Sequence, residues 1–284
     1  MNIVNKEIFV TGASGFIGTE LTKTLLKRNK SFVSISRKKI NIDIKNSLIV
    51  NNYEIIEPSA GASIIHLAEP NIISEINQMD DYELKKIINL TKQLLKKNWG
   101  HFIYISSVVL YDDNKDHSLS TSDEVVIRDN YTKLKATCEK MVIDYGGTVL
   151  RLSNVYGPQM SSKNVFSDIF KQLDSNNSVY INNLMSIRDY IWVSDVINAI
   201  ICSEEKKLNE IFNVGTGVST SVEGLLNLIL KISNKYNVEI LSDERNSTKS
   251  TIKLDIEKTK KMLCWTPQVS LKSGLKKLLI ENKK

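Results

Sequence analysis

Short apolar runs alternate with longer segments of helical periodicity through the first half of the chain. The apolar runs predict strands because they are short and rich in β-branched residues; they are 8–10, 32–35, 64–67, 102–105 and 148–150. Between them, hydrophobic residues recur at the spacing of one helix face; the predicted helices span 16–26, 83–97 and 131–145. Strands that alternate with helices, mostly without hairpin turn signals, predict an α/β fold with a doubly wound parallel sheet.

The pattern becomes irregular after Gly157-Pro158. A strand over 186–193, a helix and a strand over 211–214 still fit the first half. We therefore expect a dinucleotide-binding domain over residues 1–155, with 186–215 returning to it. We expect the remaining segments to form a smaller, interleaved C-terminal substrate lobe; they are 156–185 and 216–284. Ligands of such sheets lie at the carboxyl ends of the strands.

Composition narrows the class of protein. The 284 residues carry a net charge of +6, but the basic residues are scattered, and no nucleic-acid motif accompanies them. We expect no nucleic-acid partner and no membrane partner. The three cysteines, Cys138, Cys202 and Cys264, form no metal-ligand or redox pattern. We expect no metal, a reduced setting and a cytoplasmic location.

A glycine-rich segment, Thr11 to Gly18, joins the first predicted strand to the first helix. Glycines at 12, 15 and 18 let the backbone turn sharply and approach a pyrophosphate closely. The helix that follows offers free N–H groups and the positive end of its dipole to that anion. Strand, glycines and helix in this order predict a Rossmann-type dinucleotide site.

The end of the second predicted strand bears on which dinucleotide binds. NAD-binding proteins usually place an acidic residue there, which accepts hydrogen bonds from the ribose hydroxyls. Here Ser36 is followed by Arg37, whose planar guanidinium suits a 2′-phosphate. We expect NADP (as NADPH) rather than NAD, although NAD stays open. Asp43 and Ile44 are weaker candidates for contact with the adenine.

A second group of residues predicts acid/base chemistry. Tyr131 and Lys135 are four apart on a predicted helix and so share one face. A free tyrosine has a pKa near 10, and both a neighbouring ammonium and an oxidised nicotinamide favour its phenolate. Tyr131 is the expected general acid/base, and Lys135 is expected to hold the nicotinamide ribose. Ser107, just past an apolar strand, is expected to donate to the same substrate oxygen, with Ser106 as the alternative.

Together these segments resemble the extended short-chain dehydrogenase/reductase family, also called the NAD-dependent epimerase/dehydratases. The resemblance covers essentially the whole chain. It rests on the glycine segment, on Tyr131 and Lys135, and on several shorter segments in family order; the latter are 66–68, 106–111, 151–158, 188–195, 213–217, 255–258 and 263–267. It implies a nucleotide-diphosphate sugar as substrate and a homodimer as the assembly.

The resemblance also implies roles for particular residues. The implied cofactor-binding residues are Gly12, Ser14, Gly15, Phe16, Ile17, Gly18, Arg37, Asp43, Ile44, Leu67, Ala68, Ser106, Tyr131 and Lys135. The implied substrate-binding residues are Ser107, Asn154, Arg188 and Arg245. The chain departs from the family in a short stretch before His66. It also lacks an asparagine at the start of the helix over 83–97, where Tyr82 or Glu83 stands.

The two residues after Ser107 favour one kind of reaction. Relatives that dehydrate a hexose carry Asp-Glu there, decarboxylating relatives keep a Glu, and relatives that epimerise C3 and C5 use a Cys. This chain has Val108-Val109, which cannot move protons. What remains is the reduction of a keto-sugar, typified by a 4-keto-6-deoxy sugar, or C4 epimerisation with tightly bound NAD. Arg37 favours the reductase. A non-catalytic dinucleotide-binding sensor is the alternative outside enzyme chemistry.

Overall fold

The structure, a computed structural model, describes residues 7–37, 47–175, 177–243 and 250–281. Its main feature is a seven-stranded parallel sheet. In sheet order the strands are β10 (Ile211–Val214), β6 (Thr148–Leu152), β5 (His101–Ser107), β4 (Ser63–His66), β1 (Ile8–Thr11), β2 (Phe32–Ser36) and β3 (Ser47–Ile49). The predicted doubly wound parallel sheet is thereby confirmed.

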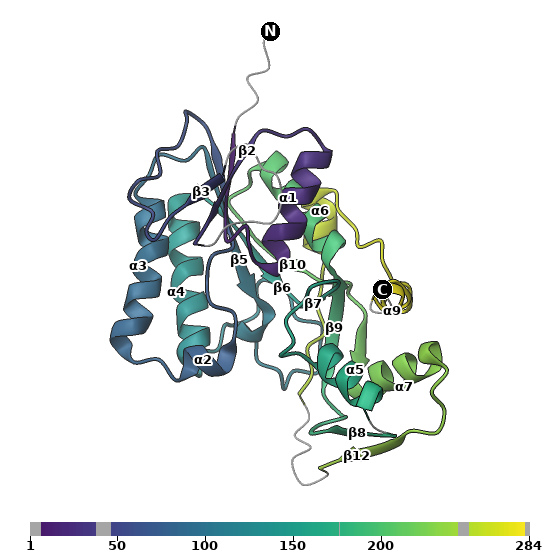
Figure 1. Cartoon of the computed structure of the whole chain (residues 1–284). Helices are drawn as coiled ribbons and strands as arrows, with labels where there is room; N and C mark the ends of the chain where they lie inside the picture. The colour runs from purple at the N-terminus through teal and green to yellow at the C-terminus, as the bar shows by residue number, and fades with distance from the viewer. Residues whose placement is uncertain (1–6, 38–46, 176, 244–249, 282–284) are drawn as a thin grey trace.

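Helices cover both faces of this sheet (Figure 1). On one face lie α1 (Phe16–Lys27) and α6 (Val193–Lys206); on the other lie α3 (Asp81–Leu95) and α4 (Asn130–Tyr145). Two clusters of buried apolar side chains fill the spaces between sheet and helices. This burial follows from the sequence pattern, since central strands such as β1, β4 and β6 are buried along their whole length.

The order of the strands fixes where a ligand binds. The chain runs outward from β1 to β2 and β3, then returns to β4 on the other side of β1. Such a reversal is the topological switch point of an open α/β sheet, and ligands bind at the carboxyl ends of the strands beside it. The glycine segment follows β1, and Leu67-Ala68 follows β4. Both segments therefore lie at the switch point.

The second half of the chain adds smaller sheets. One has three strands; in sheet order they are β11 (Ser219–Ser221), β9 (Ile187–Trp192) and β7 (Asn154–Tyr156). The other pairs β8 (Ser178–Ile181) with β12 (Glu239–Ser242). The remaining helices are α2 (Ile73–Asn77), η1 (Val108–Leu110), α5 (Val165–Ser175), α7 (Val222–Ser233), α8 (Glu257–Leu263) and α9 (Leu271–Glu281). In Figure 1, α5, α7, β8 and β12 gather at one end of the molecule, beyond β7 and β9.

The predicted return of residues 186–215 to the first domain needs one correction. β10 is a strand of the large sheet, whereas β9 pairs with β7 and β11 in the three-stranded sheet. A short apolar run predicts a strand but not its partner, and for this reason the sequence pattern did not distinguish the two positions. The boundaries of the two domains stay a prediction. No helix among the described residues is long and apolar enough to cross a membrane.

Candidate active site

The glycine segment packs tightly against the end of β4. Gly12 has a φ of 69°, and a Cβ added to it would lie 2.8 Å from the carbonyl carbon of Leu67. A Cβ on Gly18 would lie 2.2 Å from the carbonyl oxygen of Gly12. Any larger residue at either position would therefore displace backbone. Gly15 caps α1 without a side-chain hydrogen bond, and the first turn contains no acidic residue. The N-terminus of α1 thus fits a pyrophosphate.

Arg37 stands immediately after β2, next to the switch point. It is exposed, and its charge acts on the buried phenol of Tyr53, which follows β3. Burial raises the pKa of Tyr53 to about 12, and Arg37 opposes part of that rise. Tyr53 was not among the predicted site residues. Asp43 and Ile44 lie outside the described residues, so their predicted contact with adenine stays a prediction.

The structure brings Ser107, Tyr131 and Lys135 to the carboxyl end of β5. Tyr131 and Lys135 lie on α4, whose start is fixed by a capping box between Asp129 and Thr132. The amide of Tyr131 donates to Oδ1 of Asn77 at 2.9 Å, which ties α4 to α2. The side-chain nitrogen of Lys135 lies 6.0 Å from the centre of the Tyr131 ring. The two residues therefore share one face, as predicted.

The two serines at the end of β5 have different surroundings. Oγ of Ser107 accepts a hydrogen bond from the amide of Val109 at 3.2 Å, which leaves the hydroxyl hydrogen free to donate. Oγ of Ser106 is buried and has no hydrogen-bond partner among the described residues. A buried, unsatisfied hydroxyl is costly unless a ligand meets it. Ser107 is thus disposed to bind a substrate oxygen, and Ser106 to meet a polar group of a bound cofactor.

Lys135 has a partner that the sequence patterns did not indicate. Its ammonium donates to Oε2 of Glu69 at 2.8 Å and to the carbonyl oxygen of Ile105 at 3.0 Å. The Lys135 and Glu69 side chains are only 8% and 6% exposed. An ammonium has three N–H groups, so one remains for a ribose hydroxyl. Glu69 comes directly after the strand-end segment 66–68, and its place at the carboxyl end of β4 was the available signal.

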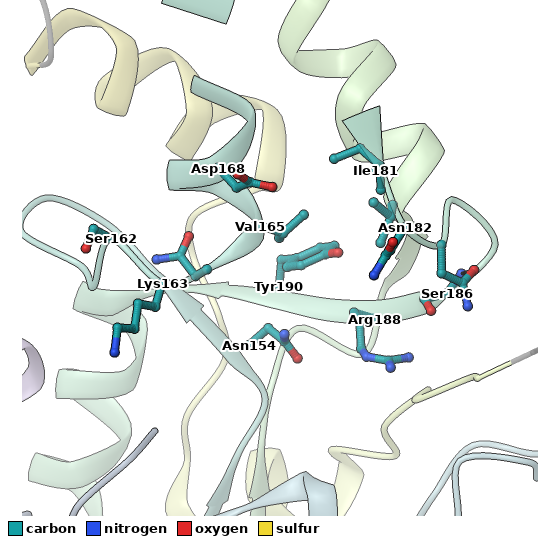
Figure 2. A pocket seen from close by; sticks show the side chains of 13 residues that line it. Asn154, Ser162, Lys163, Val165, Asp168, Ile181, Asn182, Ser186, Arg188 and Tyr190 are labelled. Atoms are coloured by element: carbon teal, nitrogen blue, oxygen red, sulfur yellow. Dashed lines mark hydrogen bonds between the residues drawn. The ribbon is translucent and has the colours of Figure 1, made fainter. Parts of the chain in front are cut away.

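A cavity of about 500 Å³ opens beside β7 and β9 (Figure 2). Arg188 and Tyr190 are two apart on β9 and so point to the same side of the strand, and Asn154 on β7 pairs with Tyr190. All three line the cavity. The other lining residues are Ser162, Lys163, Asn164, Val165, Asp168, Ile181, Asn182, Asn183, Ser186 and Val222.

Register connects this cavity to the catalytic end of the sheet. Ser107 on β5 pairs with Leu152 on β6, and Asn154 follows two residues later on β7. Arg188 donates to the carbonyl oxygen and to Oγ of Ser250, at 2.9 and 2.8 Å. Its neighbour Asp189 instead accepts from Thr216, so Arg188 and Asp189 do not form the ion pair that their adjacency would allow. Arg245 lies outside the described residues.

The chain is similar to known proteins in sequence and in fold. The model of the NAD dependent epimerase/dehydratase family matches residues 8–215. The chain is 27% identical to the dTDP-4-dehydro-6-deoxyglucose reductase of Escherichia coli, over 96% of this chain and 96% of that protein.

Two solved structures share the fold over nearly the whole chain. One is a UDP-glucose 4-epimerase of Thermotoga maritima with UDP-glucose (TM-score 0.83, 24% identity, 98% of each chain covered). The other is the protein RMD of Pseudomonas aeruginosa complexed with NADPH (TM-score 0.80, 20% identity, 97% of this chain and 98% of that chain covered). Because the family match spans the large sheet and the residues at its carboxyl edge, the chain belongs to the NAD-dependent epimerase/dehydratase family.

Proposed function

We propose that this protein is a reductase that uses NADPH to convert the keto group of a nucleotide-diphosphate 4-keto-6-deoxy sugar to a hydroxyl. Two observations support the proposal: the apolar residues after Ser107 leave reduction or C4 epimerisation as the reaction, and Arg37 at the end of β2 favours reduction with NADPH. Val108, the residue after Ser107, is 2% exposed, and Val109 follows it. Neither side chain moves protons, so the elimination of water has no acid/base pair here. Tyr131 is left as the group that exchanges a proton with the substrate.

The residues at the switch point fit a nicotinamide dinucleotide. Gly12 and Gly18 lie too close to neighbouring backbone to carry a side chain, which permits the tight turn before α1, and the start of α1 offers free N–H groups to a pyrophosphate. The unpartnered hydroxyl of Ser106 and the remaining N–H of Lys135 suit the nicotinamide half. Arg37 supports NADPH, because its guanidinium suits a 2′-phosphate and no acidic residue stands at the end of β2.

The reaction needs one hydride and one proton. NADPH, held by the glycine segment and Lys135, would supply the hydride. Ser107 donates a hydrogen bond to the carbonyl oxygen and holds it next to Tyr131. The Tyr131 hydroxyl gives its proton to that oxygen as the carbon–oxygen double bond becomes a single bond. Lys135 holds the nicotinamide ribose and favours the phenolate that remains.

The cavity beside β9 supports a nucleotide-diphosphate sugar as the substrate. Arg188 and Lys163 provide positive charge on its wall, and Asn154 provides an amide at the end nearest Ser107. Cationic side chains bind phosphate oxygens, while an amide matches sugar hydroxyls. The similarity to the Escherichia coli dTDP-4-dehydro-6-deoxyglucose reductase points to the same class of substrate.

The test is proton NMR of the sugar ring after incubation with dTDP-4-dehydro-6-deoxyglucose and with ordinary nucleotide hexoses, each with and without added NADPH. A reductase consumes one NADPH for each keto-sugar reduced and leaves purification without tightly held cofactor. Tyr131→Phe is the matched control, since it removes only the proton-bearing oxygen. Interconversion of two C4 stereoisomers without added cofactor would overturn the reductase and indicate a C4-epimerase. The absence of turnover with every sugar would indicate a dinucleotide-binding sensor.

A further inference from the structure

Glu69 lies at the centre of a buried hydrogen-bond network behind the catalytic residues. Its Oε2 accepts from Lys135 at 2.8 Å and from the hydroxyl of Tyr104 at 2.7 Å. Its Oε1 accepts from the hydroxyl of Thr91 at 3.2 Å. Three elements thus contribute donors to one carboxylate, since Lys135 lies on α4, Tyr104 on β5 and Thr91 on α3.

The carboxylate and the ammonium are both charged. Burial on its own would raise the pKa of Glu69, but the charge of Lys135 and the hydrogen bonds from Lys135 and Tyr104 lower it overall. Burial would lower the pKa of Lys135, but the charge of Glu69 raises it overall. A buried pair of this kind keeps its charges because each group compensates the desolvation of the other. The positive charge of Lys135 is therefore always accompanied by the negative charge of Glu69.

Three titratable groups around the pair are neutral at pH 7, and a fourth is held in an ion pair of its own. Burial lowers the pKa of His66 to about 4. Burial, reinforced by Glu69, raises the pKa of the Tyr104 phenol and of the Cys138 thiol well above neutrality. The neighbouring Glu139 is already paired with Arg151 at 2.7 Å. Lys135 lies 6.0 Å from the centre of the Tyr131 ring, and Glu69 is paired with Lys135.

Only one assignment of donors and acceptors is consistent along the network. Because Thr91 donates to Glu69, it accepts from Nε2 of His66 at 3.0 Å. Nδ1 of His66 then accepts from the hydroxyl of Thr11 at 2.7 Å. Oγ1 of Thr11 in turn accepts from the amide of Leu67 at 3.2 Å.

The groups at the end of this series of hydrogen bonds determine whether it can transfer protons. The amide of Leu67 and the phenol of Tyr53 both meet the Thr11 hydroxyl, and neither gives up its proton at neutral pH, since burial raises the pKa of Tyr53 to about 12; these hydrogen bonds are therefore no route for protons. They instead fix the position of Glu69.

We propose that Glu69 is a positioning residue that acts through Lys135: it holds the ammonium beside Tyr131 and offsets its positive charge. This inference rests on the proposed role of Tyr131 as the proton donor. A lone ammonium would favour the phenolate more strongly. A protonated tyrosine is the form that a reductase needs before each turnover. Glu69, in the segment after β4, thus favours the form of Tyr131 that can donate a proton to a keto-sugar.

The variant that tests the proposal is Glu69→Gln, which keeps the shape of the side chain and an oxygen for Lys135 but removes the negative charge. The alkaline limb of the kcat/KM profile for keto-sugar reduction should move to lower pH by about one unit, as expected for a unit charge acting across the partly buried site. Thr91→Val is the matched control. It removes one hydrogen bond from Glu69 and leaves the charge, so its profile should keep its position even if its rate falls.

A second measurement needs no substrate. The ultraviolet absorbance of the phenolate is titrated in wild type and in Glu69→Gln, each with and without Tyr131→Phe, so that the difference isolates Tyr131 from Tyr104. Glu69→Gln should show the Tyr131 phenolate at lower pH. An unmoved titration in a folded variant would overturn the proposal. A moved titration in a protein that reduces no keto-sugar would leave Glu69 in its role and overturn the proposed function instead.

Discussion

The ammonium of Lys135 lies 6.0 Å from the centre of the Tyr131 ring and 2.8 Å from the Glu69 carboxylate, so the tyrosine that we propose as the general acid faces an ion pair rather than a lone cation. The one-turn spacing on α4 sets the first of these relationships. The second depends on a residue that lies 66 positions earlier in the chain. The reacting centre is therefore assembled from the carboxyl ends of β4 and β5 and the start of α4.

The first prediction concerns Tyr131. Tyr131→Phe should lower turnover by about 10²–10⁴-fold, because the general acid is lost while the ring still packs. Cofactor binding, measured by fluorescence titration with NADPH, should be unchanged. Lys135→Met should instead weaken both turnover and cofactor binding, since it removes the ribose contact as well. Near-normal activity of Tyr131→Phe would transfer the acid role to Ser106 or Ser107.

The second prediction concerns the choice of cofactor. Arg37→Ala should weaken NADPH binding by roughly 1.5–3 kcal/mol, as expected for a lost charge-assisted contact. NADH binding, which involves no 2′-phosphate, should change little and provides the internal control. Isothermal titration with both cofactors measures the difference. Equal affinities for NADPH and NADH in the unmodified protein would contradict the assignment to NADP.

The third prediction concerns the substrate phosphates. Arg188 is already oriented by Ser250, so little ordering is needed when an anion binds. Arg188→Ala should raise KM by about 10- to 100-fold, the range of one charge-assisted contact. Ser250→Ala should raise KM less, because the Ser250 carbonyl oxygen still holds the guanidinium. Steady-state kinetics test both variants, and an unchanged KM in Arg188→Ala would place the phosphates elsewhere.

Much of the large sheet was predictable because its strands and helices have contrasting periodicities. The runs at 8–10 and 102–105 lie within buried strands β1 and β5, and the glycines at 12 and 18 mark the turn between β1 and α1. β3 was not predicted, because Ser47, Leu48 and Ile49 are all exposed at the edge of the sheet and show no pattern of burial. The position of β9 was not predictable either, since its pairing depends on partners far along the chain.

In the candidate site, too, some residues were predictable from local sequence patterns and others depend on distant contacts. Tyr131, Lys135 and Ser107 follow from local spacing and from strand ends. Glu69 does not, because a glutamate after a strand usually lies in solvent. Its burial becomes favourable only when Lys135, Tyr104 and Thr91 meet around it. A contact among three residues that lie far from Glu69 in the sequence cannot be predicted from one sequence.

The last prediction concerns two buried histidines, His66 and His101. Burial lowers the pKa of both to about 4, from 6.5. Nε2 of each is hydrogen-bonded to a threonine hydroxyl, Thr91 for His66 and Thr148 for His101. Both threonine hydroxyls donate a hydrogen bond to another oxygen: Thr91 to the Glu69 carboxylate and Thr148 to the Leu208 carbonyl. Each histidine is therefore held as a neutral N–H donor.

The sign of the effect on stability follows from proton binding. Below pH 6.5 the unfolded chain protonates these histidines, whereas the folded chain does so only near pH 4. The unfolded state thus binds more protons, and stability falls as the pH falls through this window. At pH 5 each histidine should cost about 2 kcal/mol of the free energy of unfolding relative to pH 7. Urea unfolding at both values, under matched ionic strength, measures the sum.

His101→Gln isolates one of the two, because glutamine keeps an N–H for Thr148 but does not titrate in this range. This variant should lose about half as much stability as wild type between pH 7 and pH 5. It also lies away from the network around Glu69, so NADPH binding should be unaffected and confirms that the variant is folded. Equal losses in wild type and His101→Gln would mean that His101 is protonated in the folded protein. The added proton would then lie on Nδ1, because Nε2 already carries the hydrogen that it donates to Thr148.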